Sequence, residues 1–135
     1  MNYETILKQI RERAFLKSNE DAERLLRVVL QALADRVERG AVEPVVERLP
    51  AEAGAYFRGE ETARPYQLDE LFKRVSKETG ADMPATVQQC QTVTAVVTEA
   101  VGHDAMRRLR EQLPVSWNRL FPTGPYHEAP AQRTT

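Results

Sequence analysis

Residues 25–37 read LLRVVLQALADRV, and residues 89–101, 64 positions later, read QCQTVTAVVTEAV. In both stretches apolar side chains recur at i, i+3, i+7 and i+11, which is the spacing of one helix face. The matched pairs are Leu26 with Cys90, Val29 with Val93, Leu33 with Val97, and Val37 with Val101. The β-branched residues of the second stretch would also suit a strand, but the first stretch is rich in Leu, Ala and Arg, which favour a helix. We therefore predict a helix in both places.

The segments on either side repeat in the same way. Before the two stretches the offset is 65, and the matched apolar sets are Tyr3, Ile6, Leu7, Ile10 and Leu68, Leu71, Phe72, Val75. After them the offset is 64, and the matched sets are Val42, Val45, Leu49, Pro50, Phe57 and Met106, Leu109, Leu113, Pro114, Phe121. A chance match is easy over one helix and hard over three helices that share a Leu-Pro pair. The sequence therefore predicts an all-α fold, a tandem duplication of a four-helix unit that forms one compact helical bundle.

The domain organisation follows from this repeat. Repeat unit 1 is expected over residues 1–57 and repeat unit 2 over residues 66–121. Residues 58–65, RGEETARP, are polar with one Gly and one Pro, as is typical of a linker. Residues 122–135 hold three prolines and no apolar periodicity, so we expect a flexible C-terminal tail.

Capping residues and prolines predict where the helices begin and end. The expected first helices run from about residue 3 to 13 and from 68 to 78, and the second from Ser18-Asn19 to near Gly40 and from Asp82 to near Gly102. The third helices are expected to take Gly40 and Asp104 as N-caps and to stop before Leu49-Pro50 and Leu113-Pro114, because proline disfavours helical geometry in the residue before it. Short fourth helices are expected to hold Pro50 and Pro114 in their first turns and to reach Phe57 and Phe121.

The apolar faces of these helices predict a core shared by both units. Its expected members are Ile6, Leu7, Ile10, Leu26, Val29 and Leu33, together with Leu71, Phe72, Val75, Cys90, Val93 and Val97.

Two parts of the repeat resemble a bacterial family catalogued as domain of unknown function 2267. They are the first helices, with Tyr3-Glu4-Thr5-Ile6-Leu7 and Leu68-Asp69-Glu70-Leu71-Phe72, and the Leu-Pro pairs followed by Phe57 and Phe121. The resemblance covers residues 2–121 and implies a helical tandem fold in the bacterial cytoplasm, with no activity and no catalytic residue attached. Unit 1 departs from the pattern because it has Ala53 and Gly54 where unit 2 has Trp117 and Asn118. Since Gly costs about 1 kcal/mol relative to Ala inside a helix, we expect the last helix of unit 1 to be weak.

The composition narrows the classes of function. Lys and Arg number 19 and Asp and Glu 20, so the net charge is −1 and no broad positive field exists to attract nucleic acid. No stretch approaches the roughly 18 apolar residues that a spanning helix needs, and no signal segment precedes the first helix. The single cysteine cannot form an internal disulfide. These features favour a cytoplasmic protein that does not bind membranes.

Two groups could carry chemistry, and each also has an ordinary structural interpretation. Glu99, His103 and Asp104 lie close in sequence and could hold a metal ion, but Gly102 is expected to end the helix and divide them. Cys90 matches the core residue Leu26, so it is expected to be a small buried hydrophobe rather than a nucleophile. We therefore predict no catalytic residue, no cofactor and no metal site, with a metal-dependent enzyme as the third possibility.

Two other groups could form an interaction surface. Arg107, Arg108 and Arg110 make the most basic run and could contact phosphates, although such a run is usually a solvated helix face. Trp117 replaces Ala53 at the matched position, and Tyr56 stands near the end of unit 1. Aromatic residues that break the repeat could mark a partner surface, whereas packing within their own unit is the ordinary interpretation.

These observations predict a binding protein rather than an enzyme. A duplicated amphipathic unit provides grooves between helices, so the expected function is that of a protein-interaction or scaffold module, with self-association as one form of it. The alternative is a nucleic-acid-binding helical protein that uses the arginine run.

Overall fold

The computed structural model describes residues 1–58 and 63–122, and every regular element in these ranges is a helix. In chain order the helices are α1 (Tyr3–Arg13), α2 (Asn19–Arg36), α3 (Arg39–Val46), α4 (Ala51–Gly54), α5 (Leu68–Thr79), α6 (Met83–Val101), α7 (His103–Glu111) and η1 (Val115–Leu120). This confirms the all-α prediction. Within the described ranges, no helix combines the length and the apolar character needed to cross a membrane. Residues 59–62 of the expected linker and 123–135 of the expected tail lie outside the described residues.

We call α1–α4 the first half of the chain and α5–η1 the second half. Side-chain caps mark the start of the first two helices in each half. Asn2 accepts a hydrogen bond from the Thr5 amide at 2.8 Å, and Ser18 accepts one from the Asp21 amide at 3.1 Å. In the second half, the Glu70 carboxylate accepts one from the Gln67 amide at 3.0 Å, and Asp82 accepts one from the Ala85 amide at 3.0 Å. Such bonds satisfy amides that have no partner within the first turn of a helix, and they confirm the predicted starts.

The structure corrects the predicted junctions between the second and third helices. The α2 helix ends at Arg36, short of Gly40, because Val37 is extended and completely buried. The N-cap of α3 is therefore Glu38 rather than Gly40. In the second half, Gly102 separates α6 from α7 with a φ of +94°, a conformation that glycine adopts at little cost. The N-cap of α7 is accordingly Gly102 rather than Asp104.

The predicted fourth helices are shorter or tighter than expected. The α4 helix has four residues, in line with the expected weakness around Gly54. Its counterpart η1 is a 3₁₀ helix of six residues. Pro50 and Pro114 lie at the N-cap positions, just before these helices rather than in their first turns. After each of these helices the chain continues to a buried phenylalanine, Phe57 or Phe121.

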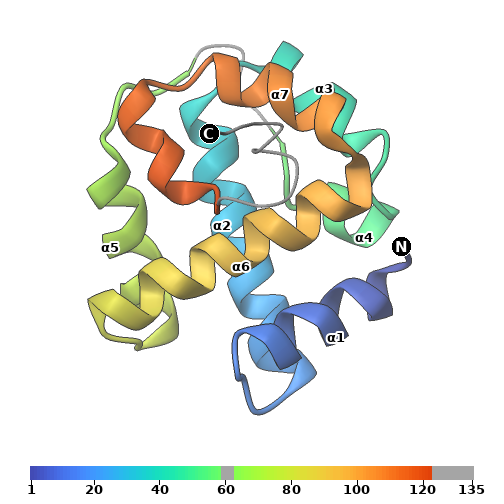
Figure 1. Cartoon of the computed structure of the whole chain (residues 1–135), viewed down its shortest axis with the longest axis vertical. Coiled ribbons are helices and arrows are strands. Elements are labelled where there is room, and N and C mark those ends of the chain that lie inside the picture. Colours follow the sequence, from blue (N-terminus) through green and yellow to red (C-terminus); the bar gives the residue numbers. More distant parts are fainter. Residues whose placement is uncertain (59–62, 123–135) are drawn as a thin grey trace, which may run out of the picture.

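The helices of the two halves interlock. The α1 helix packs against α2 and α6, while α5 packs against α6 and α2. Figure 1 shows α6 crossing α2 near the middle of the molecule, and α3 beside α7 at one end. Each half therefore covers apolar surface of the other.

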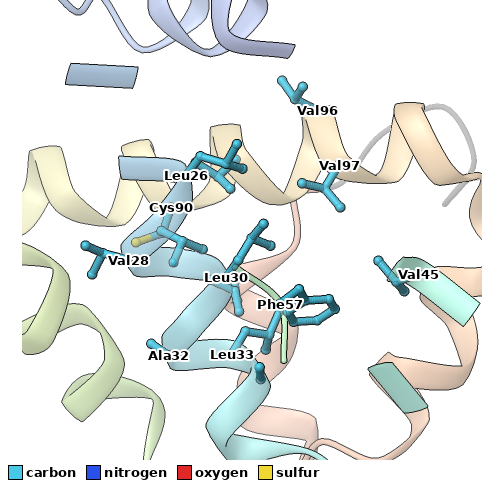
Figure 2. Close-up of a cluster of buried hydrophobic side chains, with 14 of the residues drawn as sticks. Leu26, Val28, Leu30, Ala32, Leu33, Val45, Phe57, Cys90, Val96 and Val97 are labelled. Atoms are coloured by element: carbon cyan, nitrogen blue, oxygen red, sulfur yellow. The ribbon is translucent and has the colours of Figure 1, made fainter. Parts of the chain in front are cut away.

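The predicted core is confirmed residue by residue. All twelve side chains expected in it are buried, together with others from every helix. Figure 2 shows Leu26, Leu30 and Leu33 of α2 gathered with Cys90 and Val97 of α6. The core is thus built across the crossing of the two long helices.

Candidate binding grooves

Of the residues considered for a metal site, Glu99 and Asp104 each form a separate ion pair. The Glu99 carboxylate accepts a hydrogen bond from Arg13 at 3.0 Å, and the Asp104 carboxylate accepts one from Arg107 at 2.9 Å. Among residues 1–58 and 63–122, no group of three or more His, Cys, Asp and Glu side chains is close enough to hold a metal ion. These two carboxylates therefore serve as partners for arginines.

Cys90 lies in the core at the crossing of α2 and α6, where it is completely buried. Burial alone raises the pKa of its thiol from 9.0 to about 12, because the apolar surroundings disfavour the thiolate. The thiolate is the nucleophilic form, so this environment suits packing rather than reaction.

The location of Trp117 fits packing, its ordinary interpretation, rather than a marker of a partner surface. Its side chain is completely buried, with the Tyr66 ring at 5.9 Å and the Arg36 guanidinium at 5.5 Å from its centroid. Ala53, at the matched position of the first half, is buried as well. The change from Ala to Trp therefore fills interior space, and the indole Nε1 has no hydrogen-bond partner among the described residues.

Tyr56 is half-buried and belongs to a small polar network. Its hydroxyl lies 2.8 Å from the Tyr3 hydroxyl and 3.3 Å from the Glu23 carboxylate. The Tyr3 hydroxyl donates to the same carboxylate at 2.7 Å. Burial, followed by the hydrogen bonds to Tyr56 and Glu23, raises the pKa of Tyr3 well above its usual range. This network ties α1 to α2 and to the segment after α4.

Two of the three predicted arginines meet at one groove, and the third does not line it. The groove lies between α7 and η1, has a volume of about 590 Å³, and is lined by Thr98, His103, Met106, Arg107, Arg110, Glu111 and Asn118. The Arg110 guanidinium lies 4.7 Å from the centroid of the Phe121 ring. Arg108 is exposed on the neighbouring part of α7. We call this the α7–η1 groove.

A second groove, which sequence reasoning missed, lies between α3 and α4. It has a volume of about 720 Å³ and is lined by Arg39, Val42, Glu43, Val46, Glu47, Ala51, Gly54, Ala55, Phe57 and Arg58. We call it the α3–α4 groove. Its size falls in the range of about 300–1,000 Å³ that is usual for ligand sites.

The two grooves correspond at the repeat offset. Six lining residues of the α3–α4 groove match six of the α7–η1 groove 64 positions later: Arg39 with His103, Val42 with Met106, Glu43 with Arg107, Val46 with Arg110, Glu47 with Glu111, and Gly54 with Asn118. The offset itself was the signal that could have located the missed groove. The α3–α4 groove is the more acidic of the two, with Glu43 and Glu47, and the α7–η1 groove is the more basic, with Arg107 and Arg110.

Comparison with known proteins places the chain in a family without assigning an activity. No curated protein matches the sequence. The family described as "Uncharacterized conserved protein (DUF2267)" matches residues 3–120, which is nearly all of the helical region. The helical architecture, the repeated Leu-Pro segments and this match agree: the chain belongs to the DUF2267 family.

Proposed function

We propose that this chain is a tandem duplication of one four-helix unit that acts as a protein-binding module, and that its α7–η1 groove binds acidic, partly apolar segments of partner proteins. The observation that carries the proposal is the pair of matched grooves, which share positions but differ in charge. Its proposed setting is the bacterial cytoplasm, which the family resemblance implies. The proposed role is binding without catalysis and without a cofactor.

Contacts between the halves support the duplication. Asp35 and Glu99 are 64 residues apart, and each accepts a hydrogen bond at 3.0 Å from an arginine on the first helix of the other half, Arg74 or Arg13. The two arginines do not stand at matched positions, but in both cases the second helix of one half is joined to the first helix of the other, as a twofold relation between the units would place them.

A second pair of contacts at the ends of the long helices follows the same offset. Arg48 donates to the Val101 carbonyl at 3.2 Å. Gln112, 64 residues after Arg48, accepts from the Glu38 amide at 3.2 Å. A residue just after the third helix of each half thus contacts the backbone at the junction between the second and third helices of the other half.

The chemistry of the α7–η1 groove favours an acidic segment. Met106 offers an apolar and adaptable surface. Arg107 and Arg110 offer planar guanidinium groups, which bind carboxylates well. Arg108 adds exposed positive charge nearby. An apolar surface bordered by arginines suits a peptide with apolar and acidic side chains better than a phosphate backbone, which offers negative charge without apolar side chains.

Nucleic acid remains the alternative candidate, and one observation speaks for it, the exposed arginine run on α7. Arg107 is already paired with Asp104, Arg110 lies over Phe121, and Glu111 stands in the same groove. With so few arginines, set among carboxylates in a chain of net charge −1, the groove suits a short acidic segment better than a duplex, whose binding relies on many phosphate contacts.

Selection of peptides from a random display library against the full chain tests the proposal. We expect the selected peptides to be enriched in Asp and Glu beside apolar residues. Arg107→Glu should weaken their binding by about tenfold or more, because it places a carboxylate in the groove. The measurement is fluorescence anisotropy of a labelled peptide.

Arg24→Glu is the matched control. Arg24 is also an exposed helical arginine, and it pairs with the Asp three residues before it at 3.1 Å, as Arg107 does at 2.9 Å. It lies outside both grooves, so its change should leave peptide affinity as it is. Failure to enrich any peptide, or equal losses in the two variants, would refute the proposal. Duplex DNA binding at about 50 mM salt that depends on Arg107 would support the alternative instead.

A further inference from the structure

Phe15 combines two features that are unfavourable in an isolated chain. It lies in the turn after α1, its side chain is 82% exposed, and its φ is +58°. Among residues 1–58 and 63–122, it is the one residue other than glycine with a positive φ. The left-handed region costs free energy for a residue with a Cβ, and a fully solvated aromatic ring gains nothing from burial. An outlier of this kind is a reason to look for a role.

The second half shows that this turn does not need a phenylalanine. Gly80 stands 65 residues after Phe15, at the offset of the first helices, and caps α5 with a φ of +80°. Glycine is the usual residue at this point of a helix end. The Phe15 side chain therefore contributes nothing that the turn geometry requires.

The α3–α4 groove has features complementary to the Phe15 turn. Its apolar lining includes Val42, Val46 and Phe57. Glu43 and Glu47 lie one helical turn apart on its edge, both exposed, and neither carboxylate has an ion pair within the described part of the chain. Arg39 and Arg58 also line the groove, so the place for a positive charge is the exposed edge formed by Glu43 and Glu47. This edge beside the apolar lining suits a ligand with an apolar tip and a positive charge next to it.

Lys17 supplies that charge two residues after Phe15. It is exposed, and its ammonium group has no ion pair with any residue in 1–58 or 63–122. Since Phe15 is exposed, it does not occupy the groove of its own chain. A second copy offers both halves of the contact, and the small net charge of −1 gives little repulsion between copies.

We propose that the chain self-associates by inserting Phe15 of one copy into the α3–α4 groove of a second copy, with Lys17 of the first facing Glu43 and Glu47 of the second. This rests on the proposed role of the grooves as binding sites, and it names the occupant of one of them. Such a contact is heterologous: the first copy retains a free groove and the second a free Phe15 turn, so the assembly can extend into a chain or close into a ring.

Sedimentation velocity on the full chain, over concentrations up to about 1 mM so that weak association is visible, tests this directly. We expect the weight-average mass to rise with concentration for the wild type. Phe15→Ala should remain a monomer throughout, because it removes the ring while keeping a residue with a Cβ at the turn. Val115→Ala is the matched control, since Val115 is also 82% exposed and lies outside both grooves; it should associate as the wild type does.

The groove side is tested by exchanging charges. Glu47→Lys should abolish association, and Lys17→Glu combined with Glu47→Lys should restore it at least in part, which a merely damaged fold would not do. A wild type that stays monomeric, or association that survives Phe15→Ala, would overturn the proposal. Co-sedimentation with phosphatidylglycerol vesicles that needs Phe15, without association between copies, would also overturn it and would identify a lipid surface as the partner. Peptide binding that depends on Arg107 is measured at the other groove, so its success or failure is separate from this result.

Discussion

Phe15 and Gly80 hold equivalent left-handed turns with very different side chains. Both follow the first helix of their half, and their φ angles are +58° and +80°. The backbone conformation is thus preserved while the side chain varies. We therefore expect the residue at this turn to affect the free energy of unfolding.

We predict that Phe15→Gly stabilises the folded monomer by about 0.5–1 kcal/mol. Relief of the left-handed strain is worth roughly 1–2 kcal/mol, and the greater freedom of glycine in the unfolded chain removes part of this gain. Urea unfolding of dilute protein gives the measurement. Phe15→Ala, which keeps a Cβ in the strained conformation, should show a smaller gain. A Phe15→Gly variant less stable than the wild type would mean that the ring packs against its own chain.

The burial of Cys90 makes a second prediction at the scale of one residue. The raised pKa of about 12, against 9.0 ordinarily, keeps the folded thiol protonated at pH 8. A thiol reagent such as DTNB should therefore react only as fast as the chain unfolds. Rapid stoichiometric labelling of the native protein would contradict the placement of this residue.

The same pKa difference fixes the direction of a pH effect. As the pH rises above 9, the unfolded chain loses the thiol proton first, while the folded chain keeps it until about pH 12. The contribution of Cys90 to stability is therefore constant below about pH 9 and falls between the two pKa values. Cys90→Ala should flatten this part of the stability profile.

Residue type alone left the place of Trp117 open between a partner surface and the interior. Its departure from the repeat was real, but the spacing of the short Val115–Leu120 segment did not reveal which side faces inward, because a 3₁₀ helix turns faster than an α-helix. Cys90 was placed correctly because it lies on a long helix with a clear periodicity. The burial of a residue could thus be predicted on the long α6 helix but not on the short η1 helix.

At the scale of elements, the starts of the first two helices in each half were predicted better than the junctions between the second and third helices. Starts such as that of α2 depend on a local side-chain cap, here Ser18, which is visible in sequence. The end of α2 at Arg36 depends on the burial of Val37 in an extended conformation, which is a property of the packed molecule. The α3–α4 groove was missed for the same reason, since it exists only where the third and fourth helices meet.

Pro44 gives a prediction for α3. It lies inside this helix, where it cannot donate a hydrogen bond to the Gly40 carbonyl four residues earlier. The matched position in α7 holds Arg108. We expect Pro44→Ala to raise the free energy of unfolding by about 1–3 kcal/mol, reduced somewhat by the added freedom of the unfolded chain.

Chemical denaturation measures this effect, and Arg108→Ala serves as its control. Arg108 is exposed at the matched position, so its change should stay within about 0.5 kcal/mol of the wild type. A loss of stability in Pro44→Ala would show that the proline ring packs more favourably than its missing hydrogen bond costs.

At the scale of the whole molecule, the two halves complete one another. The first helix of each half packs on the long helix of the other, and the core gathers at the crossing of α2 and α6. The sequence predicted this shared core because its apolar faces repeat at a fixed offset. Pairing between halves was not visible in the pattern, since equivalent faces fit equally well within a half or across it.

One consequence follows for cooperativity. A molecule whose halves cover each other's apolar surface should unfold in a single transition. Two independent bundles joined by a linker would unfold separately. The single tryptophan, Trp117, lies in the second half and reports on it by fluorescence.

The most direct measurement therefore follows the second half after damage to the first. Leu33 of α2 is almost completely buried, so Leu33→Ala should cost about 2–5 kcal/mol. With one shared core, Trp117 fluorescence and far-UV circular dichroism should shift together to the same lower urea midpoint. A Trp117 transition that stays at the wild-type midpoint while the helical signal splits in two would contradict the interlocked fold.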